Sequence, residues 1–299
     1  MEPVRLPRLV TAMAVAVASL WAACFILTFT FPILNAHLGP AKTFGLYAVI
    51  CVLGCIFIYC KLPETKNKTL EDLERDRLAR LDPVLSSEEV DLLVARLHCE
   101  PLVGPEGKLV SLEDARIQCS MAAYPLSTLL DCQAVRDFAN SPTILTIARN
   151  YLGCTPTISS IGVRWSFPKP SRPDSTQSFH RDVDDWRFMK AFIYLTDVER
   201  ESGPHCYVKR THRTSSRLRA SRYSSVELEQ ECGAEAIETV VGPRGTTFIA
   251  DTFGIHCGIP PLARPRLILQ VQYSILPIYA FRYDPLKLPI SRGENRYIN

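Results

Sequence analysis

Two long runs of apolar residues dominate the first sixty positions of the chain. Val10–Leu34 is a stretch of 25 residues without a charge, and Phe44–Cys60 is a second, shorter uncharged run. A helix needs about 20 apolar residues to cross a bilayer. The segment between the runs, 35–40, is rich in turn-forming residues. The pattern therefore predicts two membrane-spanning helices that form a hairpin over residues 1–62.

Basic residues lie beside both ends of this hairpin and are nearly absent from its turn. They are Arg5, Arg8, Lys61, Lys66 and Lys68, with Lys42 alone in the turn. Because basic residues are enriched in the cytoplasmic segments of membrane proteins, we expect both termini to lie in the cytoplasm.

After a charged stretch, which we interpret as a cytoplasmic linker over 63–80, the pattern becomes that of a globular protein. Ser86 followed by Glu89 is typical of a helix start, and apolar residues then recur at helical spacing. Ser141–Pro142 predicts the start of another helix. We expect these helices to pack on the outside of a sheet.

From Thr157 onward the pattern is that of β-strands separated by turn residues. The predicted strands are Ile158–Trp165, Arg187–Leu195, Gly203–Lys209, Gly245–Ala250 and Arg266–Ile275. Short strands with long connections favour an all-β double-stranded β-helix, or jelly roll, with flanking helices. We assign this fold to residues 81–299.

The last predicted strand has one apolar and one largely polar face, because side chains alternate along a strand. Leu267, Leu269, Val271 and Tyr273 share the apolar face, and Arg266, Ile268, Gln270 and Gln272 share the other. A guanidinium on the inner face of a sheet requires an anionic partner. Arg264 has the same parity but precedes Pro265 at the mouth of the strand, so Arg266 is the better candidate for an anion site.

Composition and charge narrow the possible functions. The net charge is +3, and Lys and Arg are scattered along the sequence rather than clustered in a basic run. Both observations argue against a nucleic-acid partner. The 11 cysteines are dispersed and form no C-x-x-C pair, which predicts reduced thiols rather than a disulfide framework.

The candidate chemistry lies in His180, Asp182 and the distant His256. Two imidazoles and one carboxylate can occupy one face of an octahedral metal and leave the opposite face open, as in non-haem Fe(II) oxygenases. Arg266, ten residues after the second histidine, can hold the carboxylate of a dicarboxylic co-substrate. Other nearby groups are expected to play structural parts; they are Asp184, Asp185, His205, His212 and Cys257.

The segment from Pro63 to Glu74 resembles the end of a major-facilitator sugar transporter, where P-E-T-K-x-K-T-L-E-x-x-E follows the last membrane helix. The resemblance covers about residues 5–75. It implies two spans of a larger bundle, which are expected to anchor the chain rather than to transport. Two origins stay open: a genuine fusion, or a coding sequence that joins two neighbouring genes.

The second resemblance covers about residues 80–290 and is to the phytanoyl-CoA dioxygenase family. It rests on an ordered set of motifs: His180-Arg181-Asp182, Tyr194-Leu195-Thr196-Asp197-Val198, Gly203-Pro204-His205, His256 and Arg264-Pro265-Arg266-Leu267. Lys209-Arg210-Thr211 and Cys257 depart from the family's common residues, which would alter the shape of the substrate pocket.

This resemblance implies an Fe(II)- and 2-oxoglutarate-dependent dioxygenase. His180, Asp182 and His256 would bind Fe(II), and Arg266 would bind 2-oxoglutarate, with Tyr194 and Gln177 as further co-substrate neighbours. Such an enzyme would use O2 to hydroxylate a small organic substrate, acyl-CoA-like or a secondary metabolite, and would release succinate and CO2. The alternative is a transporter-derived membrane fragment fused to a catalytically silent jelly-roll binding domain.

Overall fold

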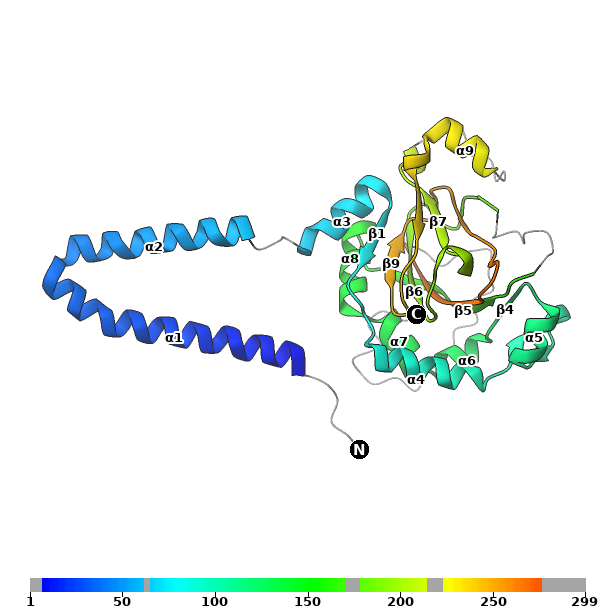
Figure 1. Ribbon diagram of the computed structural model, residues 1–299, viewed down its shortest axis with the longest axis horizontal. Helices are drawn as coiled ribbons and strands as arrows, with labels where there is room; N and C mark the ends of the chain where they lie inside the picture. The colour runs from blue at the N-terminus through cyan, green and yellow to red at the C-terminus, as the bar shows by residue number, and fades with distance from the viewer. Residues whose placement is uncertain (1–6, 62–64, 170–177, 214–222, 276–299) are drawn as a thin grey trace. The chain divides into compact units, whose positions relative to one another are not determined.

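The chain folds into two units that separate between Glu64 and Thr65. The computed structural model describes residues 7–61, 65–169, 178–213 and 223–275 (Figure 1). The first unit is helical, and the second contains the strands. Each is described by itself below.

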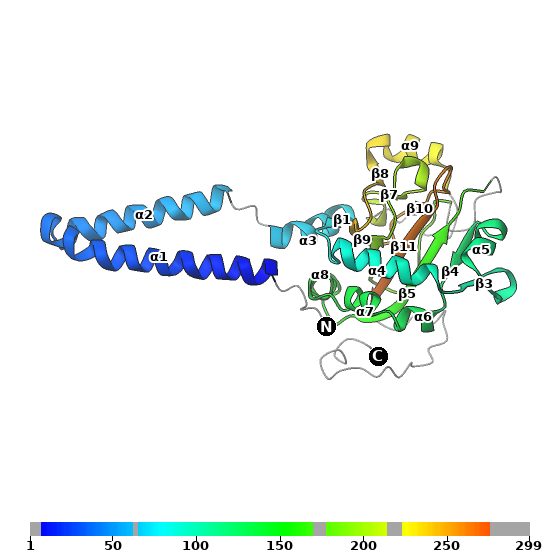
Figure 2. The same ribbon diagram turned by 60° about the horizontal axis from the view of Figure 1, so that its bottom comes forward.

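The N-terminal unit is a hairpin of two long helices, α1 (Pro7–Leu38) and α2 (Pro40–Lys61). Gly39 makes the turn between them with a positive φ of 76°, a backbone conformation that glycine adopts without strain. The helices lie side by side in both views (Figures 1 and 2). The Phe31 and Phe44 ring centroids are 5.6 Å apart, and the hydroxyls of Thr30 and Tyr47 are 2.9 Å apart. The helical hairpin agrees with the prediction, and the crossing of a membrane by both helices stays a prediction.

Large apolar side chains remain exposed on this hairpin. In the residues described, the segment Trp21–Leu38 is long and apolar enough to cross a membrane, whereas Pro40–Gly54 is apolar but shorter. Trp21 is 72% exposed and Phe25 is 68% exposed. A continuous apolar surface of this kind marks a contact with lipid or with another protein.

The predicted linker over 63–80 differs from the structure, where most of it is ordered in the C-terminal unit. Thr65–Asp76 forms helix α3, and Leu78–Leu81 forms strand β1. β1 pairs antiparallel with β9 (Thr247–Ala250). The physical reason is the apolar side chains within the charged stretch: Leu73 is fully buried and Leu78 is nearly so.

The remaining strands complete two antiparallel sheets. An eight-stranded sheet has the order β1-β9-β6-β11-β5-β4-β2-β3, and a three-stranded sheet has the order β10-β7-β8. Their bounds are β2 (Leu102–Val103), β3 (Leu109–Val110), β4 (Met121–Ala123), β5 (Thr157–Ser166), β6 (Phe188–Tyr194), β7 (His205–Val208), β8 (Ile237–Val240), β10 (His256–Gly258) and β11 (Arg266–Ser274). The predicted strands correspond to β5, β6, β7, β9 and β11, and the jelly-roll fold is confirmed.

Helices cover the outer face of the large sheet. They include α4 (Ser87–His98), α7 (Gln133–Ala139) and α8 (Pro142–Leu152), whose buried side chains form one core with Leu267, Leu269 and Val271 of β11. α4 begins with the expected capping box between Ser86 and Glu89. The other helices are α5 (Leu112–Gln118), α6 (Leu126–Leu130) and α9 (Ser225–Cys232).

The inner face of the large sheet looks toward the small sheet and forms the functional cavity. Phe192, Tyr194 and Ile268 from this face pack with Tyr207 of the small sheet in a separate apolar cluster. Arg266, Ile268 and Gln270 line a cavity beside that cluster. The alternation predicted for the last strand is therefore confirmed, with its polar face directed inward.

Candidate metal centre

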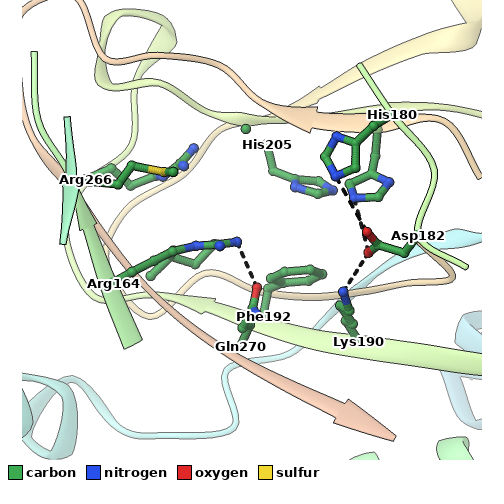
Figure 3. Close-up of a pocket in the computed structure, with 12 residues that line it drawn as sticks. Arg164, His180, Asp182, Lys190, Phe192, His205, Arg266 and Gln270 are labelled. Atoms are coloured by element: carbon green, nitrogen blue, oxygen red, sulfur yellow. Dashed lines mark hydrogen bonds and ion pairs between the residues drawn. The ribbon is translucent and has the colours of Figure 1, made fainter. Parts of the chain in front are cut away.

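His180, Asp182 and His256 come together at one end of the cavity, and Figure 3 shows His180 and Asp182 there. Nε2 of His180 lies 3.5 Å from one carboxylate oxygen of Asp182, and Nε2 of His256 lies 3.5 Å from the other. One donor atom from each residue lies within 4.8 Å of the others, and this is a group that could hold a metal ion in the described chain. The three residue types predicted from the sequence therefore meet in one place.

Backbone pairing sets the relative positions of the three donors. His180 and His256 exchange both backbone hydrogen bonds, at 2.9 and 3.0 Å, and the backbone N–H of Asp182 donates to the carbonyl of Thr252 at 2.9 Å. His256 begins β10, and His180 pairs with it as an isolated bridge outside the named strands. Residues 76 positions apart are thus held as direct neighbours by the backbone.

Both imidazoles are oriented with Nε2 toward the cavity. Nδ1 of His180 lies 2.8 Å from the carbonyl of Ser178, and Nδ1 of His256 lies 3.0 Å from the carbonyl of Gly254. A carbonyl oxygen accepts hydrogen bonds and does not donate them, so each Nδ1 is the donor and carries a proton. The lone pair of each ring is then on Nε2. Burial lowers the pKa of His256 to about 4, although the Asp182 carboxylate opposes this shift. His256 is therefore neutral at physiological pH, as metal binding requires.

Lys190 of β6 neutralises the carboxylate of this group. Its Nζ donates to Asp182 at 2.6 Å and lies 3.6 Å from Asp184. Burial by itself would raise the pKa of Asp182, but His256, Lys190 and His180 together outweigh burial and hold this pKa well below its usual range. Asp182 is consequently ionised and able to act as a metal ligand.

Arg181 lies between His180 and Asp182 in the sequence and links their segment to the loop that precedes His256. Its guanidinium donates to the carbonyl of Phe253 at 2.8 Å and to the carbonyl of Thr211 at 2.6 Å. It also lies over the Phe253 ring, 5.5 Å from the centroid. Arg181 thereby positions the segment that carries the second histidine.

We expect Arg181→Met to lower the free energy of unfolding by about 2–4 kcal/mol, because charge-assisted hydrogen bonds are lost and two buried carbonyls lose a donor. Metal affinity should fall as well. Arg149→Met, which removes an exposed arginine from α8, is the matched control and should change neither. Urea denaturation and metal titration measure the two effects. Equal values for both variants would contradict a positioning role for Arg181.

Arg266 lies at the other end of the cavity from the three donors (Figure 3). It is 4% exposed, and one terminal nitrogen donates to the hydroxyl of Ser166 at 3.3 Å. Its Nε and Nη1 have no partner among the described residues. Burial lowers the pKa of Arg266 to about 10, so the guanidinium is still charged at neutral pH. Arg264, by contrast, is exposed and pairs with Glu199.

The cavity also contains residues that the sequence did not single out. Arg164, Lys190 and Gln270 line it, together with His205. His205, which was expected to play a structural part, lies buried in β7, where its ring stacks 5.6 Å from that of His256. The available signal was strand parity: Lys190 lies on the same face of β6 as Phe192 and Tyr194, just as Gln270 lies on the same face of β11 as Arg266.

Tyr194 and Gln177 were expected near the co-substrate. The hydroxyl of Tyr194 donates to the carbonyl of Val240 at 2.8 Å and accepts from the backbone N–H of His205 at 2.9 Å. Burial raises its pKa to about 12. The residue thus links the two sheets and is not among those that line the cavity. Gln177 lies outside the described residues.

Three further residues, Asp185, His212 and Cys257, were expected to play structural parts. Asp185 accepts backbone hydrogen bonds from Trp186 and Ile275, and His212 lies in a short 3-10 turn. Cys257 is buried opposite Cys206 in the small sheet. The cysteines whose side chains are described are free thiols, which agrees with the expectation of reduced cysteines.

Comparison with known proteins separates the same two parts of the chain. Residues 9–76 match the family described as sugar (and other) transporter. This part is 37% identical over 70 residues to a facilitated trehalose transporter Tret1-2 homolog of Drosophila sechellia, and 43% identical over 71 residues to the facilitated trehalose transporter Tret1 of Aedes aegypti. These alignments cover 23% and 24% of this chain, but only 14% and 9% of the relatives. The match and the apolar helix support membrane association.

The C-terminal unit is similar in fold to several solved structures. HygX from Streptomyces hygroscopicus, with nickel, 2-oxoglutarate and hygromycin B bound, aligns with a TM-score of 0.51 and 16% identity, over 69% of this chain and 86% of that one. The alpha ketoglutarate dependent epimerase SnoN from nogalamycin biosynthesis aligns with a TM-score of 0.52 and 17% identity, over 79% of this chain and 98% of that one. EctD from S. alaskensis in its apoform aligns with a TM-score of 0.50 and 17% identity, over 69% of this chain and 75% of that one. The C-terminal unit therefore has the same fold as HygX, SnoN and EctD, and it follows a segment similar to part of a sugar transporter.

Proposed function

We propose that the C-terminal unit is a non-haem Fe(II)- and 2-oxoglutarate-dependent dioxygenase that hydroxylates a small organic substrate and releases succinate and CO2. One observation carries this proposal: the two-histidine, one-carboxylate group and an unpaired buried guanidinium face each other across a single cavity. Such a donor set fits Fe(II) and leaves coordination positions open. The guanidinium fits the distal carboxylate of a dicarboxylic acid. HygX, which shares the fold, binds nickel and 2-oxoglutarate.

In this proposal each residue has a defined task. His180, Asp182 and His256 hold the metal, and the backbone carbonyls at their Nδ1 atoms keep the rings in place. Arg266 fixes the far end of 2-oxoglutarate. Bound iron would allow O2 to act as the oxidant, with 2-oxoglutarate as the source of two electrons, so that one oxygen atom would enter a C–H bond of the substrate and the other would enter succinate as CO2 is released. The buried rings of Phe192 and Phe248, which stack 4.9 Å apart, shield the inner face from water.

The substrate we propose is acyl-CoA-like or a secondary metabolite, as the resemblance to the phytanoyl-CoA dioxygenase family implies. The alternative, a silent binding domain, is less well supported, because the donor set is complete and His256 is in the neutral form that binds metal. A silent domain has no need to keep these groups aligned.

A succinate-release assay tests the proposal. The full chain in detergent, with Fe(II), ascorbate, O2 and 2-oxoglutarate, is incubated with a panel of carboxylic acids, acyl-CoA thioesters and polyhydroxylated small molecules. Metal-dependent succinate release above that of Asp182→Ala is expected, even when slow and uncoupled from a substrate. Release no greater than that of Asp182→Ala under every condition would argue for the binding domain.

We also propose that the helical hairpin, residues 1–62, anchors the enzyme to a membrane with both termini and the catalytic unit in the cytoplasm. The basic residues before α1 and after α2 support this orientation. The catalytic unit in this proposal includes α3, which packs on α8, and β1, which pairs with β9.

In sealed vesicles with the cytoplasmic face outward, added protease should degrade the C-terminal unit. The glycosylation sequon at Asn67 should remain unmodified, since it would face the cytoplasm. If the C-terminal unit is fully protected until detergent is added, or if Asn67 carries a glycan, the orientation is the opposite of the one proposed. Recovery of the chain in the carbonate-washed supernatant would contradict the anchor itself.

A further inference from the structure

The cavity contains a second guanidinium that the proposed function does not use. Arg164 of β5 lines the same cavity as Arg266, and one of its terminal nitrogens donates to Gln270 at 2.9 Å. Its Nε has no partner among the described residues. Within the part of the chain that the structure describes, no carboxylate forms an ion pair with either arginine.

A buried cation without a counter-ion is costly, so it indicates a site where an anion binds. The carboxylates at the other end of the cavity already have a cation of their own, because Lys190 pairs with Asp182 and Asp184. The positive charges left over are those of Arg164 and Arg266. A carboxylate that enters this end of the cavity can pair with both of them.

Strand register places Arg164 on the path between the metal group and Arg266. Along β11, Arg266 pairs with Ser166, Ile268 with Arg164, and Gln270 with Phe192. The next inward residue, Gln272, pairs with Lys190, which holds Asp182. Because the guanidinium of Arg164 reaches Gln270, it lies one step closer to the metal group than Arg266 does. In Figure 3 it points toward the cavity from the side opposite Asp182.

The size of the cavity leaves room for one small molecule. Its volume is about 90 Å³. One water needs at least about 10–15 Å³ of such space, so the cavity has room for several waters or for one small molecule. A ten-atom dicarboxylate that reaches from the metal donors to Arg266 would fill most of this space. It would therefore pass within reach of Arg164.

We propose that Arg164, oriented by Gln270, is a second co-substrate-binding residue, so that 2-oxoglutarate is held by two guanidinium groups rather than by Arg266 alone. This inference rests on the proposed function. Arg164 of β5 would then contribute to co-substrate selection. A site with two cations favours a dicarboxylate over a 2-oxo acid with a single carboxylate, because a single carboxylate bound at the metal leaves both cations unpaired.

The test is the affinity of the full chain, loaded with Mn(II) under nitrogen, for 2-oxoglutarate. Arg164→Met should weaken binding about tenfold or more, since a hydrogen bond to a charged group is lost. Arg164→Lys should lie between Arg164→Met and the unmodified chain. Gln270→Glu keeps the size of the side chain but gives Arg164 an internal carboxylate partner, so the co-substrate must compete and its affinity should also fall. Arg116→Met, on the exposed face of α5, removes the same charge and should have no effect.

Metal affinity and the thermal melting curve of each variant show whether the fold is intact. If Arg164→Met and Gln270→Glu bind 2-oxoglutarate within twofold of the unmodified chain while Arg266→Ala loses it, the inference about Arg164 is overturned and the proposed function stands. If Arg266→Ala also binds normally, the 2-oxoglutarate site itself is wrong. If Arg164→Met and Gln270→Glu are both weakened with metal binding unchanged, Arg164 contacts the co-substrate.

Discussion

Removal of any one of His180, Asp182 and His256 should abolish specific metal binding by this protein. The unmodified chain should bind close to one Fe(II) or Mn(II). Each alanine variant should bind about 100-fold more weakly or worse, because changes to residues that merely support a metal ligand already cost about 10–100-fold. The donor atoms lie within 4.8 Å of one another, so loss of one leaves only two protein ligands. Anaerobic titration with Mn(II), followed by isothermal calorimetry, measures the affinity.

Two other histidines provide controls for this measurement. His98 is exposed on α4, and His98→Ala should bind metal normally. His205 is the more demanding control, because it lines the same cavity and stacks on His256. Its surroundings are Phe192 and Phe248, so His205→Phe should be accommodated and should retain the metal site. Loss of metal binding in His205→Phe, with normal binding in His180→Ala, would show that the wrong histidine has been assigned.

The local elements of the fold were predictable because their signals lie within a few residues. The capping box of α4 and the proline at the first position of α8 mark helix starts directly in the sequence. The alternation in β11 separates a helix-covered face from a cavity-lining face. This alternation assigned Arg266 to the interior face, and Pro265, which leaves Arg264 at the mouth of the strand, separated the two arginines.

What the sequence could not supply was the pairing of distant segments. β10 is three residues long and β1 lies in a charged stretch, so neither has a periodicity that a local pattern could detect. Arg164 was overlooked for a related reason. Its importance depends on the pairing of β5 with β11, which brings it beside Gln270. Strand register is set by the whole sheet, and one strand viewed alone does not reveal which cation meets which anion.

Arg266→Lys should not be a conservative change in this cavity. A planar guanidinium can donate two parallel hydrogen bonds to a carboxylate, whereas an ammonium acts as a point charge. Loss of one partner of a buried charge pair costs on the order of 2–5 kcal/mol. At about 1.4 kcal/mol per factor of ten, the affinity for 2-oxoglutarate should fall by roughly 30-fold or more. Metal affinity should be retained, because Arg266 is not one of the three donors. Titration of 2-oxoglutarate into Mn(II)-loaded protein under nitrogen measures the change.

Two further variants separate the position of this guanidinium from its charge. Arg264→Lys changes an exposed arginine two residues away, which pairs with Glu199, and should leave 2-oxoglutarate binding unchanged. Gly258→Ala keeps Arg266 but introduces a Cβ 2.9 Å from its Nη2, so the guanidinium must shift. Because a bidentate contact depends on orientation, Gly258→Ala should weaken co-substrate binding while charge and metal binding are preserved. Normal 2-oxoglutarate affinity in both Arg266→Lys and Gly258→Ala would mean that the co-substrate does not reach Arg266, and the anion that this buried cation requires would have to be a different molecule.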